Sequence, residues 1–155
     1  MNKKCVVFLL FSFFLLSVTH LHAAHDEKHT VAQVLSPDGK IEFSLLIDGF
    51  GTPRYSVKLS GETLVLDSRL GIRFEKQAAF DQGLQLVASR TASKDETWEQ
   101  PWGERRLVRD FHNELLLEFS DDSGRRFDLR VRVFNDGLGF RYEVPGQSGF
   151  DEVNI

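Results

Sequence analysis

The sequence predicts an all-β protein whose antiparallel strands form a sandwich or a barrel. Three observations indicate this class. Apolar and polar residues alternate along several short runs, which is typical of strands with one buried face. Turn-forming residues separate these runs at spacings of about eight to twelve residues. No long run has the period of an amphipathic helix, and the sequence contains no internal repeat or heptad.

Residues 1–24 have the layout of a secretory signal peptide. Lys3 and Lys4 precede an apolar run over 6–16, and cleavage is expected after Ala23 or Ala24. The run is shorter than the roughly 20 apolar residues of a transmembrane helix. The alternative is a buried N-terminal helix. We therefore expect an exported protein, periplasmic or extracellular, with no membrane attachment after cleavage.

Cleavage would remove the single cysteine, Cys5, so no disulfide or thiol chemistry is expected in the mature domain. The net charge would change from −4 to −6 with the loss of Lys3 and Lys4. Basic residues are nowhere concentrated enough to predict a nucleic-acid surface. A mildly acidic domain held by a hydrophobic core alone is the expectation.

The strands follow in order after a flexible N-terminal segment, expected over 25–33, that precedes a domain over 34–155. Pro37 and the Asp38-Gly39 pair predict the first turn, and later turns are expected at Gly61, at 121–124 and at 135–137. A helical turn is expected around 76–80. The predicted strands cover residues 31–35, 41–47, 55–59, 63–66, 70–74, 84–88, 115–119, 127–133 and 138–144. Residues 146–155 read as a turn and the start of another strand, so we expect the sandwich to be incomplete at its C-terminus, as in a truncated longer chain.

The most distinctive stretch is 95–113, which contains both tryptophans among many charged residues. We expect a long polar loop here, because a rigid β scaffold commonly carries recognition on its loops. Pro101 and Gly103 would give the loop a defined shape. The loop is the first candidate for a functional site.

Trp98 and Trp102 are the main candidates for binding in this stretch. A flat apolar ring suits the C–H face of a pyranose, while charged neighbours can bond the sugar hydroxyls. The alternative is that both rings pack in the sandwich core or against another domain. Both interpretations stay open at the level of sequence.

The carboxylates of the stretch offer a second interpretation. Glu96, Glu99 and Glu104 could be read as the carboxylate pair that glycoside hydrolysis requires. A loop without a supporting cleft fixes neither their separation nor their pKa. We expect them instead to pair with the three arginines of the stretch or to face water, those arginines being Arg105, Arg106 and Arg109.

Other polar residues have simpler interpretations. His112 is expected to be structural, since no spacing of metal ligands accompanies it. Arg130, Arg132 and Arg141 alternate with core positions, which places them on a solvated face or on a surface between domains.

Several motifs together resemble a known family. The specific elements are Glu96-Thr97-Trp98 with Trp102-Gly103-Glu104, and Asn135-Asp136-Gly137-Leu138-Gly139-Phe140-Arg141-Tyr142; Ser36-Pro37-Asp38-Gly39-Lys40, Ser68-Arg69-Leu70-Gly71 and Asn113-Glu114-Leu115 accompany them. From about residue 34 to its end, the chain resembles the N-terminal domain of glycoside hydrolase family 97.

The resemblance implies a galactose-mutarotase-like β-super-sandwich that, in the family, precedes a catalytic (β/α)8 barrel and a small C-terminal β domain. Family members are exported α-glucosidases or α-galactosidases that act on α-linked oligosaccharides or polysaccharides. Calcium assists their active site, and the N-terminal domain supplies one glutamate ligand. By this resemblance the ligand would lie beyond Ile155, so no cofactor, metal ligand or catalytic residue is expected within this chain.

The resemblance therefore implies a non-catalytic domain that binds carbohydrate or shapes the substrate site of an exported α-glycosidase. The residues expected to contact substrate or the barrel are Trp98, Trp102, Glu104, Arg105 and Asn113. Two alternatives remain: a free-standing carbohydrate-binding module, and a purely structural β domain that packs on the barrel.

Overall fold

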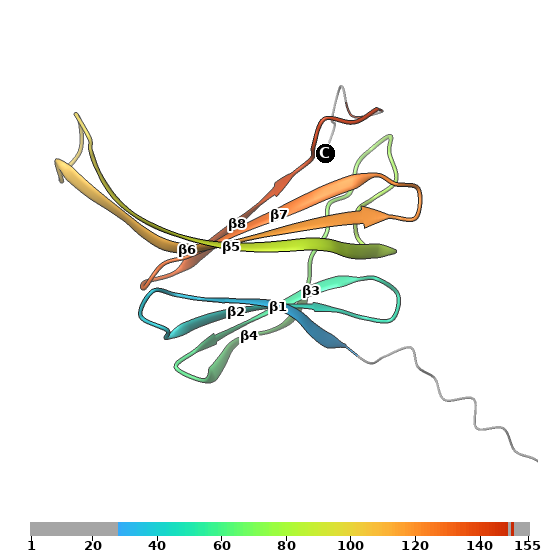
Figure 1. Ribbon diagram of the computed structural model, residues 1–155, viewed down its shortest axis with the longest axis horizontal. Helices are drawn as coiled ribbons and strands as arrows, with labels where there is room; N and C mark the ends of the chain where they lie inside the picture. Colours follow the sequence, from blue (N-terminus) through green and yellow to red (C-terminus); the bar gives the residue numbers. More distant parts are fainter. Residues whose placement is uncertain (1–27, 149, 151–155) are drawn as a thin grey trace, which may run out of the picture.

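A computed structural model describes residues 28–148 and 150 as two antiparallel four-stranded sheets packed face to face (Figure 1). The prediction of an all-β sandwich is confirmed. Within the described residues there is no helix, and hence none long and apolar enough to cross a membrane. The expected signal peptide, 1–24, lies outside the described residues.

The first sheet is a meander in which each strand pairs with the next one in sequence. Its strands are β1 (His29–Leu35), β2 (Ile41–Ile47), β3 (Pro53–Leu59) and β4 (Glu62–Arg69), in the order β1-β2-β3-β4. The predicted turn between β1 and β2 forms as expected. Gly39 donates its N–H to the Ser36 carbonyl at 2.9 Å, and Asp38 Oδ1 accepts from Ser36 Oγ at 2.6 Å.

The second sheet repeats this topology with two much longer strands. Its strands are β5 (Leu84–Glu99), β6 (Leu107–Asp121), β7 (Arg126–Val133) and β8 (Leu138–Glu143), in the order β5-β6-β7-β8. The turns predicted after β6 and β7 are both present. The β7–β8 turn also contacts the first sheet, because Asn135 Oδ1 accepts the backbone N–H of Asp38 at 3.0 Å.

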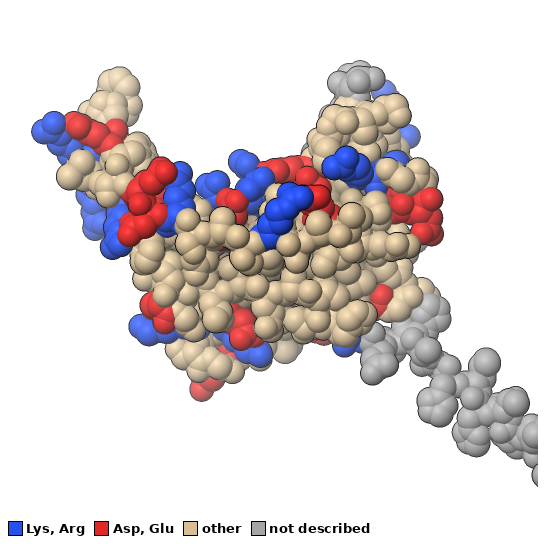
Figure 2. All heavy atoms as spheres, viewed as in Figure 1, with Lys and Arg blue, Asp and Glu red and all other residues tan. Residues whose placement is uncertain are grey.

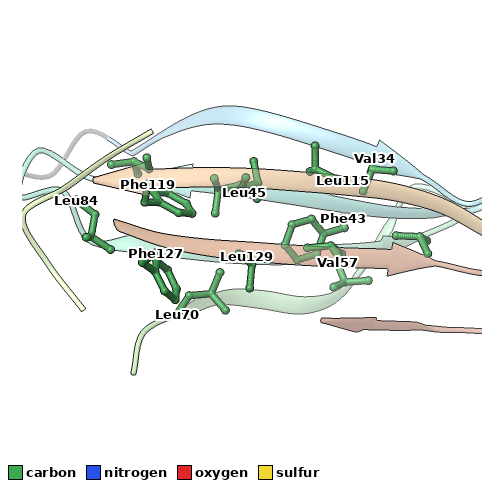
Figure 3. Packing of buried hydrophobic residues seen from close by; sticks show 14 of the residues in the cluster. Val34, Phe43, Leu45, Val57, Leu70, Leu84, Leu115, Phe119, Phe127 and Leu129 are labelled. Carbon is green, nitrogen blue, oxygen red and sulfur yellow. The ribbon is translucent and has the colours of Figure 1, made fainter. Parts of the chain in front are cut away.

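The core lies between the sheets and is built from the alternating apolar residues that predicted the strands (Figure 3). Phe43 and Leu45 of β2 are fully buried and lie beside Leu129 from the other sheet's inner face. The buried apolar residues are Val34, Ile41, Phe43, Leu45, Ile47, Val57, Leu70, Phe80, Leu84, Leu115, Leu117, Phe119, Phe127, Leu129, Val131 and Val133. Their positions show that the period-two pattern identified the buried face correctly.

Three local predictions are wrong. The strand expected over 31–35 forms, but it begins earlier, at His29, so residues 29–33 are not the flexible segment that was expected over 25–33. The strand expected over 70–74 is reduced to one bridge between Ile72 and Phe80. The helical turn expected around 76–80 does not form, because this segment carries the chain from one sheet to the other.

This inter-sheet connection, residues 70–83, is anchored by Phe80. Its backbone exchanges two hydrogen bonds with Ile72, at 2.9 and 3.1 Å. Its side chain is fully buried and stacks on Phe127, with ring centroids 5.3 Å apart. The Arg125 guanidinium lies 4.7 Å from the Phe80 ring centroid. A single apolar side chain therefore fixes a segment that has little regular structure of its own.

Candidate functional site

The second sheet carries a two-stranded arm that projects from the body (Figure 1). β5 and β6 stay paired from Leu84–Asp121 to Glu99–Leu107, but β7 pairs with β6 only from Asn113 to Ser120. Residues 94–112 thus extend beyond β7, with 100–106 as the tip. We call residues 94–112 the arm.

The arm corrects the prediction of a long loop over 95–113. Most of that stretch is regular strand, and only the tip is irregular. A two-stranded ribbon exposes both of its faces, so it needs no buried apolar face. The alternation that identified the other strands is therefore missing, although Thr97, Trp98 and Val108 are good strand formers.

Both tryptophans lie on the surface of the arm. Trp98 is 50% exposed and pairs across the ribbon with Val108, while Trp102 at the tip is 81% exposed. Packing of these rings in the sandwich core is thereby excluded. Contact with a sugar and contact with another domain both remain as interpretations.

Ion pairs across the ribbon stabilise the arm. Arg109 binds Asp95 through two hydrogen bonds of 2.7 Å, and Arg106 binds Glu99 at 2.6 Å. The Arg109 guanidinium lowers the pKa of Asp95, and Asp95 raises the pKa of Arg109. Glu99 therefore pairs with an arginine as expected, and Asp95 and Glu99 link the two strands of the arm.

Two other carboxylates of the arm behave differently from each other. Glu96 pairs with Lys94 at 3.0 Å rather than with an arginine. Among the described residues, Glu104 and Arg105 at the tip form no ion pair, and both are exposed. Gly103, next to them, has a φ of +120°, which favours glycine. The tip therefore presents Trp102, Glu104 and Arg105 to solvent on a shaped turn.

His112 and Asn113 lie at the base of the arm and have structural partners. His112 is 1% exposed, and its Nδ1 lies 2.6 Å from Asp110 Oδ1. Asn113 donates from Nδ2 to the Leu35 carbonyl at 2.8 Å and accepts from Ser93 Oγ at 2.7 Å. Asn113 thus links β1 to the second sheet, whereas the sequence analysis predicted that it contacts substrate or the barrel.

The outer face of the second sheet carries a network of arginines and glutamates that sequence did not identify as a unit. Figure 2 shows charged side chains gathered on the hollowed face beside the arm. Glu114 receives hydrogen bonds from Arg130 and, at 2.8 Å, from Arg132. Glu143 receives hydrogen bonds of 2.7 Å from both Arg130 and Arg141. The three arginines predicted for this face are therefore paired with carboxylates: Arg130 and Arg132 with residues of neighbouring strands, and Arg141 with Glu143 of its own strand.

The network shifts the pKa values of its members. Hydrogen bonds from Arg130 and then Arg141 lower the pKa of Glu143 to about 2, although burial opposes the shift. Burial also opposes the shift at Glu114, where hydrogen bonds from Arg132 and Arg130 nevertheless lower the pKa. Both glutamates are thus charged at neutral pH and serve to hold β6, β7 and β8 together.

One carboxylate on this face lacks such support. Asp128 lies directly opposite Glu118 on β6 and Glu143 on β8, so three acidic residues form one row across the sheet. Burial, and next the charge of Glu118, raise the pKa of Asp128. Its Oδ1 is buried and has no hydrogen-bond partner within the part of the chain that the structure describes.

We expect Asp128→Asn to stabilise the domain at neutral pH by up to about 1 kcal/mol, the scale of a cross-strand pair. A raised folded-state pKa means that protonated Asp128 favours folding and that this contribution is lost as pH rises through that pKa. The gain should therefore vanish below about pH 4, where the unfolded-state carboxyl is also protonated. Urea unfolding at pH 3.5 and 7 measures it. Asp136→Asn, in an exposed turn, is the control, and an equal gain from it at pH 7 would contradict the assignment.

The described residues contain no group of three or more His, Cys, Asp or Glu side chains that could hold a metal ion. The calcium ligand implied by the resemblance was placed beyond Ile155, so it stays a prediction. The geometry of the described part offers an exposed aromatic arm and a neutralised charged face.

Two solved structures that resemble this chain are carbohydrate-active enzymes. The chain superposes on a glycoside hydrolase family 97 enzyme from Pseudoalteromonas sp., solved with acarbose, with a TM-score of 0.72 and 37% identity, covering 79% of this chain and 19% of that one. It also superposes on a β-arabinopyranosidase, with a TM-score of 0.70 and 26% identity, covering 76% of this chain and 19% of that one. The fold is therefore that of one domain within much larger carbohydrate-active enzymes.

Sequence comparison identifies the family. The profile described as glycosyl-hydrolase 97 N-terminal matches residues 34–155. The chain belongs to this family. It is 35% identical over 99 residues to a probable retaining alpha-galactosidase of Streptomyces bingchenggensis, covering 64% of this chain and 15% of that protein. It is 24% identical over 118 residues to a retaining alpha-galactosidase of Bacteroides thetaiotaomicron, covering 76% and 17%. The chain thus spans less than a fifth of the length of these relatives.

Proposed function

We propose that this domain contributes the N-terminal wall of the substrate site of an exported α-glycosidase, and that the arm contacts the α-linked glycan. The observation that carries the proposal is the exposure of Trp98 and Trp102 on a projecting, ion-paired ribbon. Large aromatic side chains are well buried on average, and Trp is enriched where proteins contact a partner because its ring joins an apolar body to a polar N–H. Catalysis is assigned to the rest of such an enzyme, and no residue of this chain is proposed as catalytic.

The similarity to glycosidases supports the choice of a glycan as the partner. The relatives include alpha-galactosidases by name and an enzyme solved with acarbose. A sugar presents a C–H face that stacks on an aromatic ring and hydroxyls that bond to polar groups such as Glu104 and Arg105 beside Trp102. The family resemblance places the calcium ligand past Ile155, so no residue of this chain is proposed to bind calcium.

Calorimetric titration of the chain with panose and with maltooligosaccharides tests the proposal. We expect binding that weakens at least about tenfold in Trp98→Ala or Trp102→Ala, since truncating an anchoring Trp commonly costs 2 kcal/mol or more. Val87→Ala, an exposed apolar residue on β5 outside the arm, serves as the matched control and should bind as the parent does.

The titration also separates the alternatives. If the chain alone binds the sugar as tightly as a longer protein that also contains the catalytic barrel, the result supports a self-sufficient carbohydrate-binding module. Failure to bind any of these sugars would overturn direct sugar contact by the isolated arm, and would favour a structural domain whose arm packs on a catalytic barrel. Release of sugar from aryl α-glycosides by the chain, abolished in Glu104→Gln, would overturn the non-catalytic assignment.

A further inference from the structure

The sequence contains three Asp-Gly dipeptides, at 38–39, 48–49 and 136–137. An aspartate isomerises most readily before glycine, because glycine has no Cβ to hinder attack by its own backbone nitrogen. That nitrogen reaches the aspartyl Cγ only when the carboxyl group is free to turn toward it. All three dipeptides lie at the surface, so the hydrogen bonds of each turn decide which of them can react.

Asp38 is held by its turn. Its Oδ1 accepts hydrogen bonds from Ser36 Oγ at 2.6 Å and from the backbone N–H of Lys40 at 3.1 Å. The N–H of Gly39, the group that would attack, is itself bonded to the Ser36 carbonyl at 2.9 Å. The bond from Ser36, and next that from Lys40, lower the pKa of Asp38. This depletes the neutral carboxyl group that must lose water, so both reacting groups are restrained.

Asp48 is held in a similar way. Its Oδ1 accepts the backbone N–H groups of Phe50 at 3.0 Å and of Thr52 at 2.9 Å, and its Oδ2 lies 3.9 Å from Arg54 Nε. Burial opposes the shift, but hydrogen bonds from Thr52 and then Phe50 lower the pKa of Asp48. Turning this carboxyl group toward the next backbone nitrogen would break both hydrogen bonds to the main chain.

The third dipeptide lacks these restraints. Between residues 28 and 148, Asp136 has no hydrogen bond or ion pair, and the N–H of Gly137 has no acceptor. The turn is closed instead by the N–H of Phe134, which donates to the Gly137 carbonyl at 2.8 Å. A Cβ on Gly137 would meet nothing within 4 Å. The carboxyl group and the nitrogen are therefore both free, and the dipeptide has room to rotate.

We propose that Asp136 is a site of spontaneous covalent modification, at which aspartate isomerises to isoaspartate. The Gly137 nitrogen forms a bond to Asp136 Cγ, its proton and the carboxyl hydroxyl leave together as water, and a five-membered cyclic imide results. One water then adds to either carbonyl of the imide and breaks that carbonyl's bond to nitrogen. Opening at Cγ restores aspartate, whereas opening at the α-carbonyl gives isoaspartate. The sum of the steps is an isomerisation that needs no other reactant.

The product would alter a turn that joins the two sheets. In isoaspartate the backbone runs through the former side chain and is longer by one methylene group, while the free carboxylate stands on Cα. The residue before it, Asn135, accepts the backbone N–H of Asp38 at 3.0 Å. The modification would therefore act on a contact between the β7–β8 turn and the first sheet. The dipeptide shares no residue with the arm, so this inference does not depend on the proposed sugar contact.

The test incubates the full chain for several weeks at physiological temperature and mildly acidic pH, both folded and in concentrated guanidinium chloride. Peptide mapping with electron-transfer fragmentation then measures isoaspartate at each site. In the folded protein we expect at least tenfold more isoaspartate at Asp136 than at Asp38 or Asp48. In the denatured chain, where no turn is held, we expect comparable amounts at all three sites.

Two substitutions test the chemistry at the site. Gly137→Ala hinders the attacking nitrogen, and the variant should fold because Gly137 does not have a positive φ and the added methyl group meets no neighbour. It should lose most of the isoaspartate at Asp136. Gly139→Ala, whose methyl group also meets nothing within 4 Å, is the matched control and should keep the parent's level.

Four results would overturn the proposal. The first is an equal level of isoaspartate at the three sites of the folded protein. The second is none at Asp136 under conditions in which the denatured chain forms it. The third is the same excess at Asp136 in the denatured chain, which would assign the selectivity to local sequence rather than to the fold. The fourth is an unchanged level in Gly137→Ala.

Discussion

Replacing Phe80 with Ala is expected to destabilise the domain by about 3–5 kcal/mol, the range for removing a large buried aromatic side chain. Phe80 is fully buried and contacts Phe74, Phe127 and Phe150, with ring centroids 5.3–5.8 Å apart. Its loss would leave a cavity and would also release the connection between the sheets. The free energy of unfolding of native proteins is about 5–15 kcal/mol, so this substitution is expected to remove a large part of it.

Urea unfolding followed by circular dichroism measures this change as a shift in midpoint. Leu66→Ala is the control, because Leu66 is 78% exposed and surface changes usually stay within about 0.5 kcal/mol. A loss below about 1 kcal/mol in Phe80→Ala would show that the connection is not anchored by this ring.

Gly51→Ala is expected to cost more than about 2 kcal/mol, and considerably more than Gly39→Ala. Both glycines have a positive φ, +70° at Gly51 and +74° at Gly39, so both substitutions carry the penalty of roughly 1–2 kcal/mol for the left-handed conformation. They differ in their surroundings. A Cβ at Gly51 would lie 2.6 Å from the Leu84 backbone nitrogen, whereas a Cβ at Gly39 would meet nothing within 4 Å.

The difference between the two variants isolates the backbone clash. Gly51 accepts the N–H of Leu84 at its carbonyl, at 3.0 Å, so the β2–β3 turn is packed on the start of β5. An added methyl group would force these two sheets apart at that corner. Thermal unfolding of both variants checks the prediction, and equal melting temperatures would contradict a close approach of the turn to Leu84.

The body of the sandwich could be predicted from sequence because one face of each strand is buried. In β7, Phe127, Leu129, Val131 and Val133 alternate with charged residues, and all four are buried. The Asp38-Gly39 turn was equally recoverable, because its geometry depends on the residues themselves. Local chemistry and burial agree in these segments, so the pattern specifies the structure.

The arm could not be predicted in the same way. Its strands are stabilised by pairing with each other and by ion pairs such as Asp95–Arg109, not by an apolar face. No periodic signal marks such a ribbon, and its charged residues resemble those of a loop. The prediction for the inter-sheet connection was wrong for the opposite reason. The alternation of Ile72 and Phe74 is typical of a strand, but the chain leaves the sheet at this point.

The candidate site was partly accessible from sequence. Trp98 and Trp102 were identified, and their exposure decides against the core. The partners of the predicted arginines were missed, although Glu114 and Glu143 stand at the outward positions of their strands. The alternation predicts that these residues lie on the outer face of the sheet. Which carboxylate pairs with which arginine depends on the register between strands, and the register is set only in the folded sheet.

The meander topology of the two sheets has a consequence for how the chain reaches its structure. Among residues 28–148, every strand pairs only with its neighbours in sequence, so each hairpin can close over a short loop at little cost in chain entropy. Only the docking of the two sheets brings distant parts of the sequence together, as at β1 with β6. Contacts that are local in sequence favour rapid folding. The topology therefore divides folding into the formation of two nearly independent sheets and their final association. The two sheets are joined by the connection that carries Phe80.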